Sequence, residues 1–288
     1  MVPRESSPQY TFQPRLPSPQ QSASLPAVPH DEDTTTPTAA ANLVINAVTS
    51  HQVNLSWDAS NDDTGVTHYK IYRDTILLAT VATTEFDDLT VLPGNTYLYS
   101  IQAFDAAANA SPSVSSSVTL EPTSLWTNLN EPTNYGSDGY PLELGIKLVP
   151  KVAGRITGVK FYKAPGDTGE HIASLWQQSD SSLLARGNFT NETASGWQTM
   201  VFDIPVDVDA DEIYVASYST SSGMFGSTHG YFLVDEFASQ YITAPATNSI
   251  GGNGVYATSI GLFPSSTYGG NNYWADVLFI PSKDTVSP

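Results

Sequence analysis

The side chains best suited to bind a ligand gather between Tyr218 and Trp274, where aromatic rings alternate with amides, a histidine and acids. Aromatic rings stack on the apolar C–H faces of sugars, and amide or carboxylate groups hydrogen-bond the sugar hydroxyls. Many of these residues fall in segments rich in Gly and Ser, which form the loops where binding residues concentrate. We therefore expect a glycan-binding site made from nine of them: Phe225, His229, Tyr231, Asn253, Tyr256, Tyr268, Asn271, Asn272 and Tyr273.

The same aromatic residues also have a purely structural interpretation. Tyr has an apolar face and a polar tip, so it often pins a long loop onto the body of a sandwich. For any single residue of this region the structural role is the better interpretation, whereas the cluster as a whole suits a ligand site. Trp176 and Trp197 lie in strand-like runs and are expected in the core.

The sequence lacks the common catalytic patterns. None of its five histidines pairs with another at metal-ligand spacing, and neither HExxH nor Gly-x-Ser-x-Gly is present. The Gly-rich run 251–254 lacks the Lys of a phosphate-binding loop. Two carboxylates can hydrolyse a glycoside, but a chain with 29 acids contains many pairs by coincidence. We therefore expect a protein that is not an enzyme and requires no cofactor.

A structural calcium ion is the one cofactor that the acidic residues suggest. Glu143 and Asp276 lie on the first and last expected strands of the second domain, and such strands often lie side by side in jelly rolls, where two carboxylates could share Ca²⁺. The alternative is that both carboxylates bond loop backbone, which we favour. The alternating acids of 207–211 and the run 61–63 are better explained as solvated turns.

Composition excludes several classes of partner. The chain has 288 residues and a formal charge of −18, which repels phosphate backbones and anionic lipid. It has no cysteine, hence no disulfide or thiolate chemistry. No apolar run approaches the about 18 residues of a membrane span. The N-terminus has no apolar signal core, so we expect a missing signal, an intracellular protein, or a component of a particle released by lysis.

Residues 1–40 form a separate Pro-rich region without hydrophobic periodicity. Such a segment cannot offset the entropy of folding alone, and it is typical of an extended linker. The other interpretation is an arm that orders on other protein subunits. Its expected anchors are Arg4, Tyr10, Phe12, Arg15 and Leu16.

Residues 41–121 show seven short strands with alternating apolar positions, among them the strand that ends at Trp57. Trp57, the run 69–73 and the Leu92-Pro93-Gly94-x-x-Tyr97 corner resemble a fibronectin type III domain of the bacterial subtype. The resemblance implies an immunoglobulin-like sandwich that acts as a spacer beside glycan-active modules. It also implies that the Tyr97 hydroxyl returns to nearby backbone.

Residues 122–283 contain eight or more strand-like runs separated by turn-rich loops, which predicts a larger jelly-roll β-sandwich, followed by a tail at 284–288. Seven runs resemble, in order, an exported bacterial family of unknown function: 142–145, 158–163, 174–176, 194–198, 214–218, 252–256 and 272–277. Its members occur beside fibronectin-like and sugar-active modules, so the resemblance implies a carbohydrate-rich, extracellular setting without catalysis.

Two functions fit these features. We expect a non-catalytic display or adhesion protein, attached to a phage virion or cell-surface structure by its arm and presenting a carbohydrate-binding head on a fibronectin-like stalk. The alternative is a carbohydrate-binding accessory region of a secreted bacterial glycan-degrading enzyme. The expected partners are a surface polysaccharide and other protein subunits, with neither nucleic acid nor membrane insertion.

Overall fold

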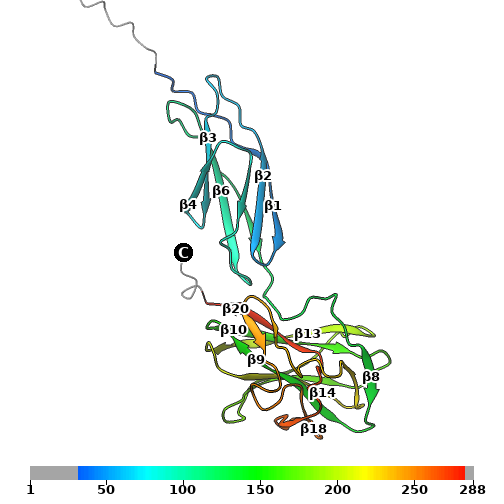
Figure 1. Ribbon diagram of the computed structural model, residues 1–288. Coiled ribbons are helices and arrows are strands. Elements are labelled where there is room, and N and C mark those ends of the chain that lie inside the picture. The colour runs from blue at the N-terminus through cyan, green and yellow to red at the C-terminus, as the bar shows by residue number, and fades with distance from the viewer. Residues whose placement is uncertain (1–31, 283–288) are drawn as a thin grey trace, which may run out of the picture.

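The computed structural model describes residues 32–282 and shows a protein built from β-strands. Figure 1 shows two β-sandwiches arranged end to end. Within the described range, no helix has the length and apolarity needed to cross a membrane. The expected arm anchors Arg4, Tyr10, Phe12, Arg15 and Leu16, like the tail at 284–288, lie outside the described residues. The all-β prediction is confirmed.

The first sandwich packs a three-stranded antiparallel sheet, in the order β1-β2-β5, against a four-stranded one, in the order β4-β3-β6-β7. A three-on-four arrangement of this kind is the immunoglobulin-like architecture that fibronectin type III domains share, as expected. Its strands are β1 (Ala41–Thr49), β2 (Gln52–Asp58), β3 (His68–Arg73), β4 (Ile76–Val81), β5 (Glu85–Asp88), β6 (Thr96–Phe104) and β7 (Val114–Thr119).

Alternation along the strands builds the core of the first sandwich. In β2 every second side chain is buried, ending at Trp57, and in β6 the buried positions include Tyr97 and Tyr99. The backbone N–H of Leu92 donates to the Tyr97 hydroxyl at 2.9 Å. This hydrogen bond confirms the predicted tyrosine corner, and it fixes the loop that leads into β6.

The second sandwich opposes a small sheet, β13-β10-β20, to a large one whose main path is β12-β11-β14-β9-β17-β16. The pair β18–β19 joins the large sheet at β9, and β8 pairs with β15 separately. Its strands are β8 (Asn134–Ser137), β9 (Leu142–Pro150), β10 (Gly154–Lys163), β11 (His171–Gln177), β12 (Leu183–Asn188), β13 (Gly196–Val208), β14 (Tyr214–Thr220), β15 (Met224–Ser227), β16 (Phe237–Ala238), β17 (Ile242–Ala244), β18 (Val255–Ala257), β19 (Ser266–Thr267) and β20 (Ala275–Pro281).

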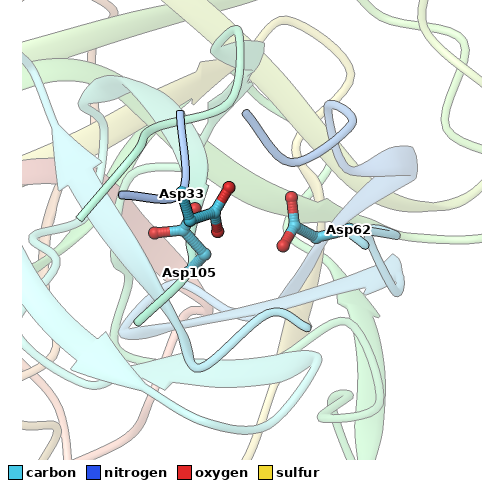
Figure 2. A group of neighbouring side chains, drawn as sticks. All are labelled: Asp33, Asp62 and Asp105. Atoms are coloured by element: carbon cyan, nitrogen blue, oxygen red, sulfur yellow. The ribbon is translucent and has the colours of Figure 1, made fainter. Parts of the chain in front are cut away.

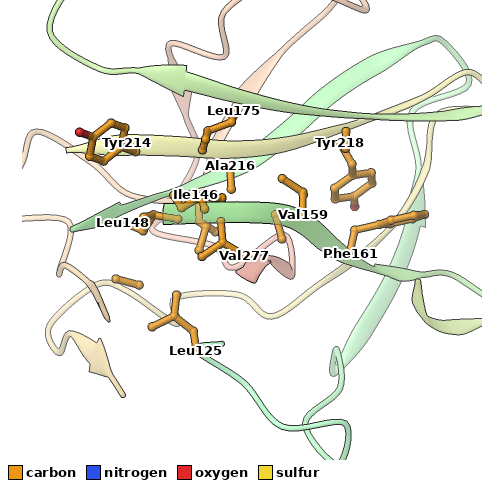
Figure 3. Packing of buried hydrophobic residues seen from close by; sticks show 14 of the residues in the cluster. Leu125, Ile146, Leu148, Val159, Phe161, Leu175, Tyr214, Ala216, Tyr218 and Val277 are labelled. Atoms are coloured by element: carbon orange, nitrogen blue, oxygen red, sulfur yellow. The ribbon is translucent and has the colours of Figure 1, made fainter. Parts of the chain in front are cut away.

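The core of the second sandwich lies between these two sheets. Figure 3 shows Phe161 and Val277 of the small sheet meeting Ile146 and Tyr218 of the large one. Every residue of β14 is buried, because one face points into this core and the other lies under the loops around β18. On the covered face Ser217 satisfies its hydroxyl with Glu143 at 2.6 Å.

Candidate functional site

A cleft of about 350 Å³ opens in the second sandwich beside the start of β9. Its walls come from the loop between β8 and β9, from β9 and β15, from β18, and from the segment before β20. Chain segments more than 100 residues apart therefore meet in one concave surface. The lining residues are Asp138, Tyr140, Leu142, Leu144, Phe225, His229, Tyr256, Tyr268, Asn271 and Tyr273.

The floor of the cleft is apolar and fixed by the sheet. Leu142 and Leu144 of β9 are almost fully buried, and Tyr256 of β18 lies opposite Leu144 in the antiparallel register. Tyr273 is also buried and meets the Phe225 ring edge to face at a centroid distance of 5.9 Å. This packing holds the two rings in place before any ligand arrives.

The rim carries exposed aromatic rings. Tyr268 is 65% exposed and Tyr140 is 45% exposed, and His229 is exposed as well. Exposed tyrosines at the edge of an apolar floor can stack on the C–H face of a sugar while their hydroxyls remain in water. The rim and floor together combine apolar area with a few polar groups, as small-molecule sites usually do.

Glycine-rich turns place the loop residues of the cleft. Gly269 and Gly270 both adopt positive φ angles, 59° and 64°, which turn the chain between Tyr268 and Asn271. The Asn271 side-chain oxygen then accepts a hydrogen bond from the Gly230 N–H at 3.2 Å. Asn271 therefore ties the loop after β15 to the segment before β20.

The surroundings of Tyr140 and Tyr273 raise the pKa values of these two phenols. The charge of Asp138 raises the pKa of the Tyr140 phenol, which donates to Asp138 Oδ2 at 3.4 Å. Burial, reinforced by the neighbouring Tyr256, raises the pKa of Tyr273 to about 12. Phenols with raised pKa values stay neutral near pH 7, so they can both donate to and accept from sugar hydroxyls.

Six of the nine residues expected at a glycan site line this cleft, and three lie elsewhere. The Tyr231 hydroxyl accepts from Trp126 Nε1 at 3.1 Å, and its ring packs against Trp126 and Trp274 in the core. Asn253 is fully buried, and its amide bonds both the N–H and the C=O of Lys147. The six lining residues are Phe225, His229, Tyr256, Tyr268, Asn271 and Tyr273.

Asn272 is the last of the three expected residues that do not line the cleft. Its side chain is buried, and its Oδ1 accepts from the Trp274 N–H at 2.7 Å. Its backbone exchanges two hydrogen bonds with Thr228, each 3.0 Å long. Asn272 therefore supports the chain on which the neighbouring cleft residues sit.

The sequence did not predict four of the lining residues: Asp138, Tyr140, Leu142 and Leu144. All four precede or begin β9, about 80 residues before the aromatic-rich region, so their proximity to it depends on the pairing of β9 with β18. The one local sequence feature that could have indicated them is the Asp-Gly-Tyr sequence at 138–140, which is typical of a surface turn and directly precedes an apolar strand.

The expectation that Glu143 and Asp276 share a calcium ion assumed that their strands lie side by side, and this assumption is wrong. Glu143 lies on β9 of the large sheet, whereas Asp276 lies on β20, whose partner is β10 of the small sheet. The two carboxylates therefore have separate surroundings, and the strands that carry them are not neighbours in either sheet.

Protein groups satisfy each of these two carboxylates. Glu143 accepts from Ser217 at 2.6 Å and from the Gly261 N–H at 3.1 Å, and burial raises its pKa. Asp276 accepts from the backbone N–H groups of Leu125 and Trp126 at 2.9 and 3.0 Å. Burial raises the pKa of Asp276 to about 6. Both therefore bond loop backbone, which is the alternative that the sequence favoured.

A second group of acids, shown in Figure 2, lies on the first sandwich. One carboxylate oxygen each of Asp33, Asp62 and Asp105 falls within 4.8 Å of the other two, and such oxygens are ligands that Ca²⁺ takes. Thr64 Oγ1 donates to Asp33 at 2.6 Å and to Asp62 at 2.9 Å, and Asn109 donates to both oxygens of Asp105. These donors already join the three loops, which accounts for the cluster structurally.

Comparison with curated proteins finds relatives that are much longer than this chain. The chain is 44% identical over 92 residues to exoglucanase B of Cellulomonas fimi and 46% identical over 80 residues to chitinase D of Niallia circulans. It is 31% identical over 142 residues to an alpha-amylase of Niallia circulans. These matches cover 32%, 27% and 49% of this chain, but only 8%, 15% and 10% of the relatives.

Two solved structures and one family model match parts of this chain. A carbohydrate-binding module of the beta-sandwich superfamily covers 74% of the chain at 13% identity, with a TM-score of 0.36. The structure described as FN3tt mut covers 30% at 21% identity, with a TM-score of 0.27. A family model matches residues 129–275, half of the chain and almost all of the second sandwich. The chain therefore belongs to the family described as a domain of unknown function, DUF4082.

Proposed function

We propose that this chain is a non-catalytic carbohydrate-binding region of a glycan-degrading enzyme, with the cleft of the second sandwich as its binding site. The observation that carries this proposal is the convergence of five aromatic rings with Asp138, His229 and Asn271 in one cleft. Apolar rings for the sugar faces and a few polar groups for the hydroxyls are what glycan recognition requires. In this proposal residues 122–283 bind the glycan, and residues 41–121 act as the spacer.

The relatives favour an accessory role over a display role. Their names are those of enzymes that act on glycans, and this chain spans a minor part of each of them. A segment shared by proteins named for different substrates suits a module that accompanies catalytic domains. Cellulose and chitin are extracellular polymers, so the proposal includes an extracellular location.

The cleft also fits binding better than hydrolysis. Glycoside hydrolases commonly use a pair of carboxyl groups on either side of the scissile bond. Asp138 is the single carboxylate among the described residues that line the cleft. A lone carboxylate beside aromatic rings can hydrogen-bond a sugar. Hydrolysis by this mechanism needs a second carboxyl group, because one acts as the acid and the other as the base or nucleophile.

Glycan arrays and pull-down with insoluble cellulose and chitin test the proposal directly. The whole chain should bind at least one glycan, and Tyr268→Ala should weaken that binding about fivefold to tenfold because a stacking ring is lost. Tyr135→Ala is the matched control, since Tyr135 is 47% exposed on the same sandwich but lies outside the cleft. Equal weakening by both substitutions, or the absence of any glycan ligand, would contradict the proposed site.

A further inference from the structure

The cleft has a one-sided charge. Among the described residues that line it, the ionisable groups other than the tyrosines are the carboxylate of Asp138 and the imidazole of His229, without any Lys or Arg. The chain as a whole carries a formal charge of −18. A site of this kind repels an anionic sugar and attracts a cationic one, and the field of the whole molecule acts in the same direction.

The structure holds Asp138 where a bound sugar would meet it. The Asp138 backbone N–H donates to the Gly223 carbonyl at 3.1 Å, and Gly139 turns the chain with a φ of 72°. The loop between β8 and β9 is thus fastened to the loop before β15. Asp138 is exposed and lines the cleft, and its carboxylate lies 3.4 Å from the hydroxyl of the rim residue Tyr140.

No basic side chain compensates Asp138. In the described part of the chain its carboxylate forms no ion pair, and its hydrogen-bond donor is the Tyr140 phenol at a long 3.4 Å. A carboxylate in this position can still accept strong, charge-assisted hydrogen bonds from a cationic donor. Tyr140, Tyr256 and Tyr268 line the same cleft, and the faces of aromatic rings attract cations.

We propose that the cleft selects sugar units that carry a protonated amino group, as in glucosamine polymers, over N-acetylated and uronic acid units. The inference rests on the proposed glycan-binding function and names its substrate class. The ammonium group pairs with Asp138 while the sugar ring stacks on the rim tyrosines. Acetylation removes the charge and adds bulk at the same atom, and a uronate brings a second negative charge toward Asp138.

Calorimetric titration of the whole chain with three oligosaccharides of equal length tests this selection. The glucosamine oligomer should bind about tenfold more tightly than the N-acetylglucosamine oligomer. The galacturonate oligomer should bind more weakly than both. In Asp138→Asn the ratio between the first two affinities should fall to about threefold or less, because the ring faces and the shape are kept and the carboxylate charge is lost. Asp203→Asn, which removes the same charge from the exposed face of β13, should keep the tenfold ratio.

The titrations distinguish a failure of the selectivity inference from a failure of the proposed glycan-binding function. If the N-acetylated or uronate oligomer binds as tightly as the glucosamine oligomer, or if Asp138→Asn keeps the full preference, the inference is wrong while the cleft stays a glycan site. If the three oligomers and a glycan array show no binding, the proposed function itself is wrong, and the inference falls with it. Thermal unfolding of both variants confirms that the substitutions leave the fold intact.

Discussion

A histidine held between two carboxylates shows how single side chains fasten the loops of the second sandwich. His171 Nε2 lies 2.9 Å from Asp167 Oδ2, and its Nδ1 lies 2.9 Å from Glu192 Oε2. Lys163 Nζ approaches the same Glu192 oxygen at 2.9 Å. All four side chains are largely buried, so the attraction between Lys163 and Glu192 is screened less than that of an ion pair at the surface.

Asp167 should make stability depend on pH in the acid range. Burial raises its pKa, but hydrogen bonds from His171 and Ser222 outweigh burial and hold the pKa at about 2, below the ordinary 3.8. Because the pKa of Asp167 is lower in the folded state, its ionised form stabilises the fold at pH values above the ordinary pKa of 3.8. This contribution is lost as the pH falls through about 2. Asp167→Asn should therefore lower the free energy of unfolding by about 2 kcal/mol at pH 7.

Urea unfolding of the wild type and Asp167→Asn between pH 7 and pH 2 measures this effect. The difference in free energy of unfolding should shrink toward zero as the pH approaches 2. Asp203→Asn serves as the control, because it removes an exposed charge of the same sign. A difference that stays constant across the range would show that Asp167 acts through packing and not through its charge.

The sequence predicted the role of Tyr97 well and that of Asn253 poorly. The resemblance of the Leu92-Pro93-Gly94-x-x-Tyr97 corner to fibronectin type III domains implied that the Tyr97 hydroxyl meets nearby backbone, and it does accept the Leu92 N–H. Asn253 and Asn271 look alike in the sequence, as amides in glycine-rich loops. One is fully buried against Lys147 and the other lines the cleft. That difference depends on which strand covers each loop, which no local pattern encodes.

At the scale of elements, the cleft depends on how closely two loops approach each other. Gly254 has a φ of 74°, and a Cβ at this position would overlap the backbone carbonyl of Asn271. The loop before β18 and the segment before β20 can therefore lie side by side because residue 254 has no side chain. This contact helps to bring Tyr256 and Asn271 to the same cleft.

Gly254→Ala should distort the cleft. The new Cβ meets rigid backbone and the left-handed φ is strained for Ala, so we expect destabilisation by about 2 to 3 kcal/mol. Gly251→Ala is a matched control in the same loop, since its φ of 69° carries the same strain but no atom lies within 4 Å of the added Cβ. Thermal unfolding and glycan affinity of the two variants separate the effects, and equal losses in both would contradict the close-approach argument.

The sheet class could be predicted from the sequence, but the neighbours of each strand could not. Alternating apolar positions predict strands such as β2 and β6 because every second side chain faces the core. The same pattern does not say that β9 lies between β14 and β17 and also pairs with β18. For this reason Glu143 and Asp276 were expected together and lie in different sheets, and Asp138 was not expected beside Tyr273.

At the scale of the whole molecule, the connection between the two sandwiches is short and held on both sides. The Gly94 N–H donates to the Glu121 carbonyl at 3.1 Å, on the side of the first sandwich. Thr123 exchanges two backbone hydrogen bonds with Phe279 of β20, at 2.9 and 2.8 Å. Pro122 is the one residue between these attachments, and its ring fixes φ.

Side chains add to this restraint at the junction. The His51 ring stacks on Tyr241 with centroids 5.4 Å apart and an angle of 21° between the ring planes. Gly94 lies so close to Ile280 that a Cβ on it would overlap that side chain. Linked domains usually move relative to one another unless their interface prevents it. These contacts are expected to hold the second sandwich in a defined orientation relative to the first (Figure 1).

Pro122→Gly should loosen the junction without unfolding either sandwich. Glycine restores free rotation at the one unattached residue, so the two sandwiches should sample a wider range of orientations. The chain contains no cysteine, so spin labels can be placed at Ser117→Cys on β7 and Thr199→Cys on β13, both exposed positions. Pulsed electron resonance should then give a narrow distance distribution in the parent chain and a broader one in Pro122→Gly.

Pro112→Gly is the matched control for this experiment, because Pro112 is exposed in a loop within the first sandwich. It adds the same backbone freedom away from the junction, so its distance distribution should stay narrow. A broad distribution in the parent chain would show that the hydrogen bonds on either side of Pro122 do not restrain the domains. If the proposed function holds, a spacer with a fixed orientation would lower the entropic cost of binding a polysaccharide that another module also holds.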